Sequence, residues 1–321
     1  MKSMLKVITM SLAFAATAAN AAEWRLGHVL PPTHPGNLAL EEAAAEIREK
    51  TEGRVDIRVF PAAQIGGAKE VLTGMTVGTH HMAFDGAGIL SQWNARLGVL
   101  EAPFLARDFA HLERMANSDT GRQIFEELRA EHGYRVLDIW YYGTRHLTNS
   151  RGPVNALADM AGLKVRVPEI ALSLSFMKAL GATPAPMAFS ELYLGLQTGV
   201  VDGQENPLPT IDAAKFYEVQ EHLALTGHLV QFVAPIVSDQ VWNTVSEEDQ
   251  RVITEVFGRV GDAYNQNVVE IEAALVSKLE EAGMKVSRPD REEMAAAMAP
   301  VYAEFESKWG EGTFAAMSAV E

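Results

Sequence analysis

The sequence predicts an α/β protein whose mature chain is large enough for two domains. Segments with strand-like alternation are repeatedly followed by segments with helical spacing, which is typical of a mostly parallel sheet flanked by helices. About 300 residues remain once an N-terminal export segment is set aside, which suits two domains. One helical pattern would be about 50 Å long at 1.5 Å per residue. That length exceeds one small domain, so we expect this helix to brace two lobes.

The first 21 residues have the pattern of a secretory signal peptide. Two lysines precede the apolar stretch 7–19, which is short for a bilayer span, and residues 19–21 are Ala-Asn-Ala, a suitable cleavage sequence. We therefore expect cleavage near Ala21 and export to the periplasm. No later stretch is long and apolar enough to predict a membrane helix.

Composition limits the possible partners. The chain has no cysteine, and without residues 1–21 it has 25 basic and 42 acidic residues. This acidic surface argues against nucleic acid or anionic lipid as a partner, so an anionic small ligand would need a local basic pocket. Because the chain is large enough to build its own cores, it does not depend on disulfides.

Residues 22–150 provide the first set of expected elements. Helices end where glycine follows them, as at Gly53, and Pro61 stops the strand before it. Asn37 is the expected cap of the first helix. The expected strands are 24–27, 55–60, 81–85 and 136–142, and the expected helices are 37–50, 67–77, 111–115 and 120–132.

The remaining residues continue the alternation. Ser246 and Asp249 form a capping pattern before apolar residues at helical spacing that continue to Leu279, and two glycines, Gly258 and Gly261, are expected to let this helix bend. The other expected strands or extended segments are 163–167, 183–187, 200–206 and 229–237, and the other expected helices are 170–180, 190–199 and 291–308.

The strand at 163–167 contains the principal candidate for ligand binding. Val165 and Val167 point to one face because side chains alternate along a strand, and Arg166 therefore points to the other. A guanidinium there is either paired with an acid of the protein or available to an anion, for which bidentate carboxylate binding is well suited. Both alternatives remain open from the residues alone.

Two further polar residues are candidates for the same site. Arg145, expected just beyond the strand 136–142, is a second cation, and Asn206 at the end of 200–206 offers one amide donor and one acceptor. Glu205 would repel an acidic ligand, so we expect it to face away and to pair elsewhere. A loop or capping role is the alternative for Asn206.

Motifs for catalysis, metal or cofactor binding are scarce, and no cofactor is expected. H-E-x-x-H, G-x-S-x-G and P-loop sequences are absent, and Gly86-Ala87-Gly88 lacks the third glycine of a dinucleotide fingerprint. Ser175 and Lys178 match S-x-x-K, which leaves a secreted serine hydrolase as a remote alternative.

At several of these residues the chain resembles a known family. The segments are Phe60-Pro61 to Gly66, Gly143-Thr144-Arg145, Asp159 to Pro168, Leu180 to Tyr193, Leu196 to Pro207, Lys215 to Val219, and Thr226-Gly227-His228. In order and spacing they resemble the periplasmic solute-binding subunits of tripartite ATP-independent periplasmic (TRAP) transporters, the DctP-like family, over nearly the whole mature chain.

The resemblance implies a fold and a function. The fold would be two α/β lobes around a ligand cleft, crossed by a long helix, with lobe I at 23–143 and 232–271 and lobe II at 144–231 and 272–321. Arg166 would bind the ligand carboxylate, with Arg145 and Asn206 as further contacts. The protein would be a monomer that delivers an organic acid to one small and one large membrane subunit, driven by an ion gradient.

The identity of the acid is left open by the residues. We expect His28, Asp85, Trp93 and His146 to line the distal pocket, where polar groups such as Asp85 suit hydroxyls better than a second carboxylate. A sugar acid is therefore the favoured ligand, with a C4-dicarboxylate or keto acid as alternatives. A free-standing sensor-type binding protein would have the same cleft with another partner.

Overall fold

The computed structural model describes residues 22–321, and the signal-peptide prediction for residues 1–21 lies outside this range. Helices and strands alternate along the described chain, as the sequence predicts. The strands are β1 (Ala22–Gly27), β2 (Val55–Phe60), β3 (Met82–Asp85), β4 (Tyr134–Val136), β5 (Trp140–Asn149), β6 (Lys164–Val167), β7 (Thr183–Pro186), β8 (Gly203–Pro207), β9 (His222–Ser238) and β10 (Lys285–Ser287).

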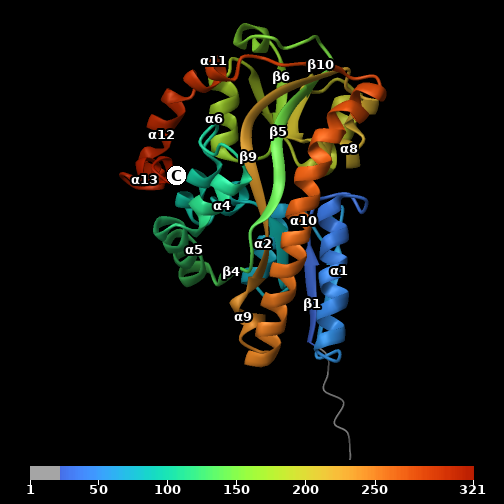
Figure 1. The fold of residues 1–321 in the computed structure, drawn as a ribbon, viewed down its shortest axis with the longest axis vertical. Coiled ribbons are helices and arrows are strands. Elements are labelled where there is room, and N and C mark those ends of the chain that lie inside the picture. The colour runs from blue at the N-terminus through green and yellow to red at the C-terminus, as the bar shows by residue number, and fades with distance from the viewer. Residues whose placement is uncertain (1–21) are drawn as a thin grey trace, which may run out of the picture.

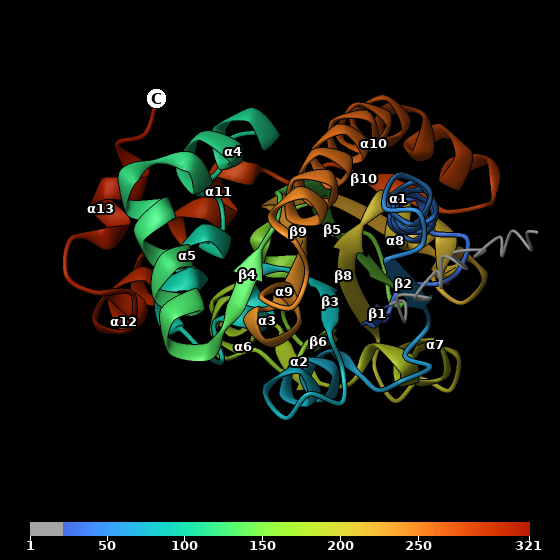
Figure 2. The same cartoon turned by 90° about the horizontal axis from the view of Figure 1, so that it is seen from below.

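The helices cover both sides of these strands (Figures 1 and 2). The α-helices are α1 (Pro35–Lys50), α2 (Ala68–Thr76), α3 (Ala87–Leu90), α4 (Phe109–Asn117), α5 (Asp119–His132), α6 (Ala171–Ala179), α7 (Phe189–Gln197), α8 (Leu208–Ala213), α9 (Asp239–Trp242), α10 (Glu247–Glu281), α11 (Arg291–Ala296), α12 (Ala299–Trp309) and α13 (Thr313–Ser318). Three 3-10 helices lie at Ala95–Glu101, Leu157–Met160 and Phe216–Glu218.

The sheet is mixed rather than mostly parallel as expected. Its order is β2-β1-β3-β9-β5-β8-β6-β7, with β4 and β10 also pairing with β9. The outer pairs β1/β2, β1/β3, β6/β8 and β6/β7 are parallel. The pairs made by β5 with β8 and β9, and by β9 with β3 and β4, are antiparallel. The parallel expectation was therefore wrong for the centre of the sheet, where β5 and β9 run side by side along the molecule (Figure 1).

The β5–β9 pair has a bulge at Gly143. The register shifts between Tyr141 and Gly143, and Gly143 has a positive φ of 125°. A Cβ added there would lie 2.6 Å from Cβ of Pro207 and 2.8 Å from Oε1 of Glu272. Only glycine fits both the conformation and the space. The predicted boundary between the lobes at residues 143 and 144 falls at this bulge, and the division into lobes stays a prediction.

The long helix α10 is fastened to this bulge. Asn265 Oδ1 accepts from the Tyr141 backbone N–H at 2.6 Å, and Glu272 accepts from the Thr144 N–H at 2.7 Å and from the Tyr141 hydroxyl at 2.6 Å. These bonds satisfy backbone and side-chain donors that the irregular strand pairing leaves available. At its N-terminus, Ser246 caps the helix by accepting from the Asp249 N–H, as the sequence predicts.

The two glycines of α10 have different surroundings. Nothing lies within 4 Å of a Cβ built on Gly258, whereas a Cβ on Gly261 would be 2.3 Å from both Asp138 Oδ2 and Trp140 Nε1. Helix α10 is continuous through both positions. Gly261 therefore allows close contact between α10 and the start of β5, and the bending that we expected at the two glycines stays a prediction.

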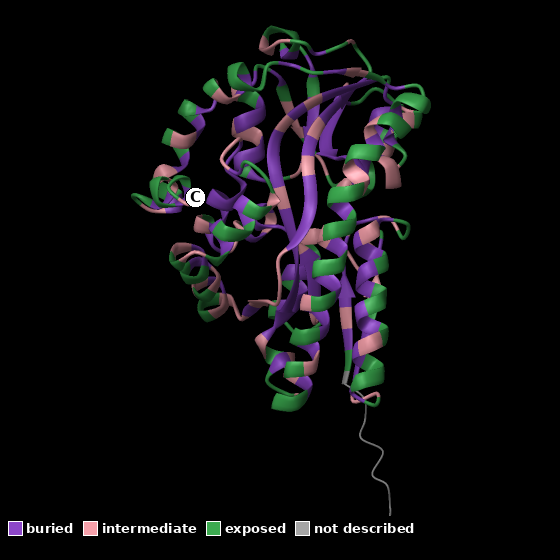
Figure 3. Cartoon of the chain, viewed as in Figure 1, coloured by how far each residue is buried: buried purple, intermediate pink, exposed green. Residues whose placement is uncertain are grey.

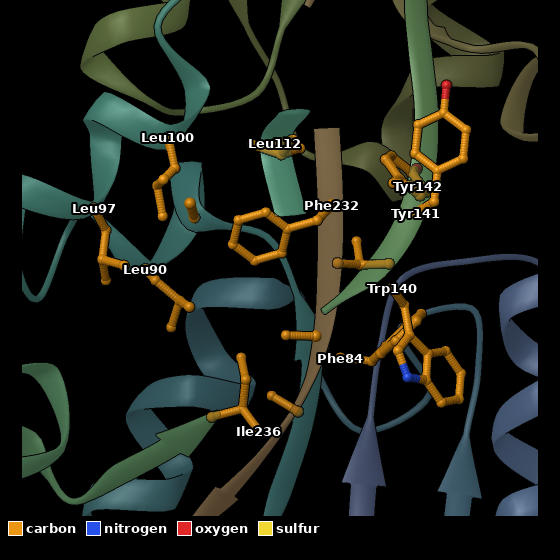
Figure 4. Close-up of a cluster of buried hydrophobic side chains, with 14 of the residues drawn as sticks. Phe84, Leu90, Leu97, Leu100, Leu112, Trp140, Tyr141, Tyr142, Phe232 and Ile236 are labelled. Atoms are coloured by element: carbon orange, nitrogen blue, oxygen red, sulfur yellow. The ribbon is translucent and has the colours of Figure 1, made fainter. Parts of the chain in front are cut away.

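The hydrophobic core follows the central strands. Figure 3 shows these strands buried along most of their length, while the outer faces of α1 and α10 are exposed. Figure 4 shows Phe232 of β9 projecting towards Leu100, and Phe84 lying close to Trp140 of β5. A smaller separate cluster, which includes Leu192, packs beneath α7, α8 and the end of α10.

The C-terminal helices lie beside α4 and α5, on the side opposite α1 and α10 (Figure 2). Helix α12 contacts both α6 and the 3-10 helix Ala95–Glu101, and α13 contacts that 3-10 helix and α5. The predicted lobe II segment 272–321 thus touches elements of both predicted lobes. The expected single helix 291–308 is two helices, α11 and α12, and α13 and β10 were missed. Within residues 22–321, no helix is both long and apolar enough to cross a membrane.

Several other boundaries differ from the expectation. Helix α1 begins two residues earlier, and its cap is His34, whose Nδ1 accepts from the Gly36 N–H; Asn37 is not the cap. The expected strand 136–142 is two strands, β4 and β5, and β5 extends to Asn149. Arg145 therefore lies inside a strand, not beyond one. Helix α7 begins at Phe189, one residue before the expected start at 190, and it has no side-chain cap.

Candidate functional site

A cavity lies between the two sides of the sheet. One side contributes the end of β3 and the start of α2, and the other contributes β6, the start of α7 and β8. About 170 Å³ is open to the centres of water molecules. One water needs roughly 10–15 Å³ by that measure, so the cavity has room for a small organic molecule.

Arg166 lies in this cavity and belongs to β6. The flanking Val165 and Val167 are fully buried, as the strand alternation predicts, and Arg166 itself is only 3% exposed. Its Nε donates to the Met187 carbonyl at 2.9 Å, and its guanidinium lies 5.9 Å from the centre of the Phe189 ring. Among the described residues no Asp or Glu forms an ion pair with it. Burial lowers the pKa of Arg166 to about 10.

Arg145 also lines the cavity, but it is bound to an acid of the protein. Its Nη2 donates to Glu205 Oε1 at 2.8 Å and to the Glu205 carbonyl at 2.6 Å, and its Nε donates to Glu205 Oε2. Both side chains are nearly fully buried. Burial alone would raise the pKa of Glu205, but Arg145 and His228 hold it below its usual range. Glu205 is outside the lining, as expected, yet its partner is the residue predicted as a second ligand cation.

Hydrogen bonds extend from this ion pair across the sheet. Arg145 Nη1 donates to Gln231 Oε1 at 2.7 Å, and Gln231 Nε2 donates to Glu101 Oε1 at 2.8 Å. On the other side His228 Nε2 lies 3.0 Å from Glu205 Oε2. Because its donors already have partners, Arg145 has less capacity than Arg166 to bind an incoming anion.

Asn206 and Asp85 are the other predicted residues found in the cavity lining. Asn206 Nδ2 donates to Gln204 Oε1 at 2.6 Å. Asp85 ends β3, and its Oδ1 accepts from the Gly86 N–H at 2.8 Å. Burial, with a smaller contribution from the nearby Glu101 carboxyl, raises the pKa of Asp85 to about 7. At a pH near this value the group is present in both forms: the ionised form accepts a hydrogen bond from a ligand and repels a second negative charge, whereas the protonated form donates a hydrogen bond.

The other three predicted residues do not line the cavity. His28 Nδ1 accepts from the Leu30 N–H and His28 Nε2 lies 3.1 Å from Asn37 Oδ1, so both ring nitrogens have protein partners. The Trp93 ring packs edge-on against Tyr134. His146 Nδ1 accepts from the Gly227 N–H at 3.0 Å. These three residues therefore lie outside the cavity lining in which we expected them, and each has a partner in a neighbouring element.

Catalytic and metal-binding arrangements find little support in the geometry. Ser175, on α6 and outside the cavity lining, donates its hydroxyl to Glu304 of α12 at 2.5 Å, so the hydrolase interpretation has no activated nucleophile at the site. Within residues 22–321 no three or more His, Asp or Glu side chains are grouped so that they could hold a metal ion.

Several cavity residues were missed from the sequence. Tyr142 and Gln231 come from β5 and β9, Met187 comes from the link between β7 and α7, and Phe189 begins α7. The segment 168–170 also lines the cavity, directly after Arg166 in the chain. Only this last segment had a usable signal, because residues that follow a strand end beside a binding residue tend to enter the same crevice.

Comparisons with known proteins agree with this architecture. Residues 26–308 match the family model described as bacterial extracellular solute-binding protein, family 7 (DctP). The sialic acid-binding periplasmic protein SiaP of Vibrio cholerae serotype O1 is 40% identical over 277 residues, which is 86% of each chain.

Two solved structures are similar over nearly the whole chain. A TRAP periplasmic solute-binding protein from Polaromonas sp. JS666, bound to D-erythronate, has a TM-score of 0.88 and 33% identity, covering 93% of this chain and 99% of that one. One from Sulfurospirillum deleyianum DSM 6946, bound to succinate, has a TM-score of 0.86 and 27% identity, covering 93% and 99%. The two-lobed binding-protein fold expected from the sequence is thereby confirmed. The chain belongs to the DctP family of bacterial extracellular solute-binding proteins, the solute-binding components of TRAP transporters.

Proposed function

We propose that this solute-binding protein captures a hydroxylated organic acid by an ion pair between the ligand carboxylate and Arg166. The observation that carries the proposal is the buried guanidinium of Arg166, which faces the cavity without an acidic partner among the described residues. An unpaired charge in a buried place is costly. A carboxylate that accepts two parallel N–H bonds would compensate it and would fix the orientation of the ligand.

The second feature that supports a ligand class is Asp85. It belongs to β3, across the cavity from β6, and it forms no ion pair within residues 22–321. A ligand hydroxyl can donate to the ionised form of Asp85 or accept from its protonated form, whereas a second ligand carboxylate would be repelled by the ionised form. The proposed ligand is therefore a sugar acid with one carboxylate, and a C4-dicarboxylate or keto acid is the alternative. The named ligands of the three similar proteins include two hydroxylated monocarboxylates and one dicarboxylate.

Binding would be coupled to closure. Arg166 and Asp85 come from opposite sides of the cavity and from different predicted lobes. A ligand that contacts both would stabilise the closed arrangement by its differential affinity, as in other hinge-closing binding proteins. The closed protein, a monomer exported to the periplasm after cleavage near Ala21, would then deliver the acid to the small and large membrane subunits.

The proposal is tested by a thermal-shift series with two four-carbon acids, D-erythronate and succinate, and with sialic acid. An acid at 100 times its dissociation constant stabilises the folded protein by about 2.7 kcal/mol. We expect D-erythronate or sialic acid to raise the melting temperature more than succinate does. We expect Arg166→Ala to abolish the shift and the exposed control Arg288→Ala to keep it.

Two results would contradict the proposal. A larger shift with succinate than with both hydroxylated acids would contradict the ligand class while leaving the role of Arg166 intact. A shift that persists in Arg166→Ala would contradict the ion pair itself.

A further inference from the structure

A chain of buried side-chain hydrogen bonds leads away from the cavity, starting at Asn206. Asn206 Nδ2 donates to Gln204 Oε1 at 2.6 Å, Gln204 Nε2 donates to Thr148 Oγ1 at 3.0 Å, and Thr148 Oγ1 donates to Gln220 Oε1 at 3.0 Å. All four side chains are at most 3% exposed. We call this chain the amide relay.

The far end of the amide relay fixes its direction. Gln220 Nε2 donates to the carbonyl oxygens of Val219 at 3.0 Å and Asp202 at 3.4 Å. A carbonyl oxygen only accepts, so the Gln220 nitrogen must face these groups and its Oε1 must face Thr148. A rotated Gln220 would place two acceptors against each other in a buried site.

The same constraint passes along each following residue. The Thr148 hydroxyl has one hydrogen, which it donates to Gln220, so it must accept from Gln204. Gln204 therefore places its nitrogen towards Thr148 and its oxygen towards Asn206. Asn206 must therefore donate an N–H of its side-chain amide to the Gln204 oxygen. Its amide oxygen and its second N–H then remain for the cavity, which Asn206 lines.

We infer that Thr148, Gln204 and Gln220 are positioning residues that hold the Asn206 amide in one of its two orientations. Without them the amide could turn over, which would exchange a donor for an acceptor at the ligand with little change in shape. Gln204 is also the β8 partner of Arg166 across the β6–β8 pair. The amide relay thus sets the polarity of a group that lines the same cavity as the guanidinium.

A purely structural role explains these residues less well. Strands β5 and β8 are already paired along five positions, including Thr148 with Gln204, so the side-chain bonds are not needed to join the strands. Buried polar groups in this place also carry a desolvation cost that apolar side chains of the same size would avoid. The inference on orientation concerns the ligand-free protein, and only its consequence for ligand binding rests on the proposed function.

The orientation is tested by nuclear magnetic resonance on the ligand-free protein. The Asn206 side-chain amide signals are assigned by their loss in Asn206→Ser, and their exchange with solvent is compared with that of the exposed Asn155. We expect at least one Asn206 side-chain amide proton to exchange at least about tenfold more slowly than those of Asn155. We expect Thr148→Ser, which keeps the hydroxyl, to retain this protection, and Thr148→Val to lose roughly five- to tenfold of it, as befits one buried hydrogen bond.

If Thr148→Val does not fold, Gln220→Met removes the far anchor and should give the same loss. Unprotected Asn206 protons in the wild-type protein, or protection that is unchanged in Thr148→Val or Gln220→Met, would overturn the inference.

A second measurement links the orientation to ligand binding. With whichever of D-erythronate, succinate and sialic acid gives the largest thermal shift, Thr148→Val should bind at least about fivefold more weakly than Thr148→Ser.

The two proposals fail in different ways. Equal affinity in the two Thr148 variants would separate the amide relay from ligand binding while leaving the exchange result intact. If none of the three acids binds, or if Arg166→Ala binds as well as the wild type, the proposed function fails and the orientation of Asn206 is still decided by exchange.

Discussion

Replacing Arg166 with methionine should make the ligand-free protein more stable. The pKa of Arg166 falls from the usual 12.5 to about 10 because the charge is buried. One pKa unit corresponds to about 1.4 kcal/mol, so holding this charge costs about 3 kcal/mol. The methionine variant would lose the hydrogen bond to the Met187 carbonyl, and this loss offsets about 1 kcal/mol of the gain from removing the charge. The expected net gain is about 2 kcal/mol, or roughly 4 °C in melting temperature.

Arg145 provides a matched control in the same cavity, with the opposite expected sign. It is paired with Glu205, so Arg145→Met leaves a buried carboxylate with only His228 beside it. Breaking a buried pair from one side typically costs about 3–5 kcal/mol. Urea denaturation of both variants without ligand measures the two changes. Destabilisation by Arg166→Met of the same size as that by Arg145→Met would refute the idea that Arg166 is kept unpaired for a ligand.

Three further predictions follow from the structure. The pKa of Asp85 is raised to about 7 in the folded protein, so the stability contributed by its protonated form is present at low pH and is lost as the pH rises through about 7. Urea denaturation should therefore show that Asp85→Asn raises the free energy of unfolding more at pH 8 than at pH 4. The same change in the free energy of unfolding at both pH values would contradict the raised pKa of Asp85. In α10, Gly258→Ala should stabilise the folded protein by up to about 1 kcal/mol and Gly261→Ala should destabilise it, because only the Cβ at position 261 has no room. Changes in melting temperature of the same sign for both variants would contradict this packing. Asn265→Ala should cost about 1–3 kcal/mol by leaving a buried strand N–H without its acceptor, whereas the neighbouring exposed Gln266→Ala should be nearly neutral in the same assay.

Local patterns in the sequence predicted the elements well where a short stretch contains all the information. The strand of Arg166 is such a case, because alternating valines and a following proline determine both its burial and its end. The long helix α10 is another, since its cap at Ser246 and its apolar spacing are local. In both, the residues that decide the conformation are within a few positions of one another.

The candidate site depended on contacts between distant residues, which no local pattern encodes. Arg145 looked like a free cation, and its partner Glu205 lies 60 positions away on a neighbouring strand. His28 and His146 looked like ligand contacts, but the structure gives them partners within the protein, Asn37 of α1 and Gly227 of β9 respectively. Whether a polar side chain is satisfied within the protein is decided by strand order and register, which the sequence alone left open.

The antiparallel centre of the sheet shows the same limit. Alternation of strands and helices predicts parallel pairs, and the outer strands follow that rule. Strands β5 and β9 depart from that rule, because they pair with each other in antiparallel orientation over most of their length. The bulge at Gly143, where this pair bends, is visible only once the register is known.

The central claim, that one buried guanidinium is kept available for a ligand carboxylate, is tested most directly by isothermal titration calorimetry. The acid with the largest thermal shift is titrated into the wild type, Arg166→Lys and Arg166→Ala. We expect Arg166→Ala to bind more weakly by about 2–5 kcal/mol, or roughly 30-fold to several-thousand-fold. Arg166→Lys should be intermediate because it keeps the charge but loses the two parallel bonds. Wild-type affinity in Arg166→Ala would contradict the account.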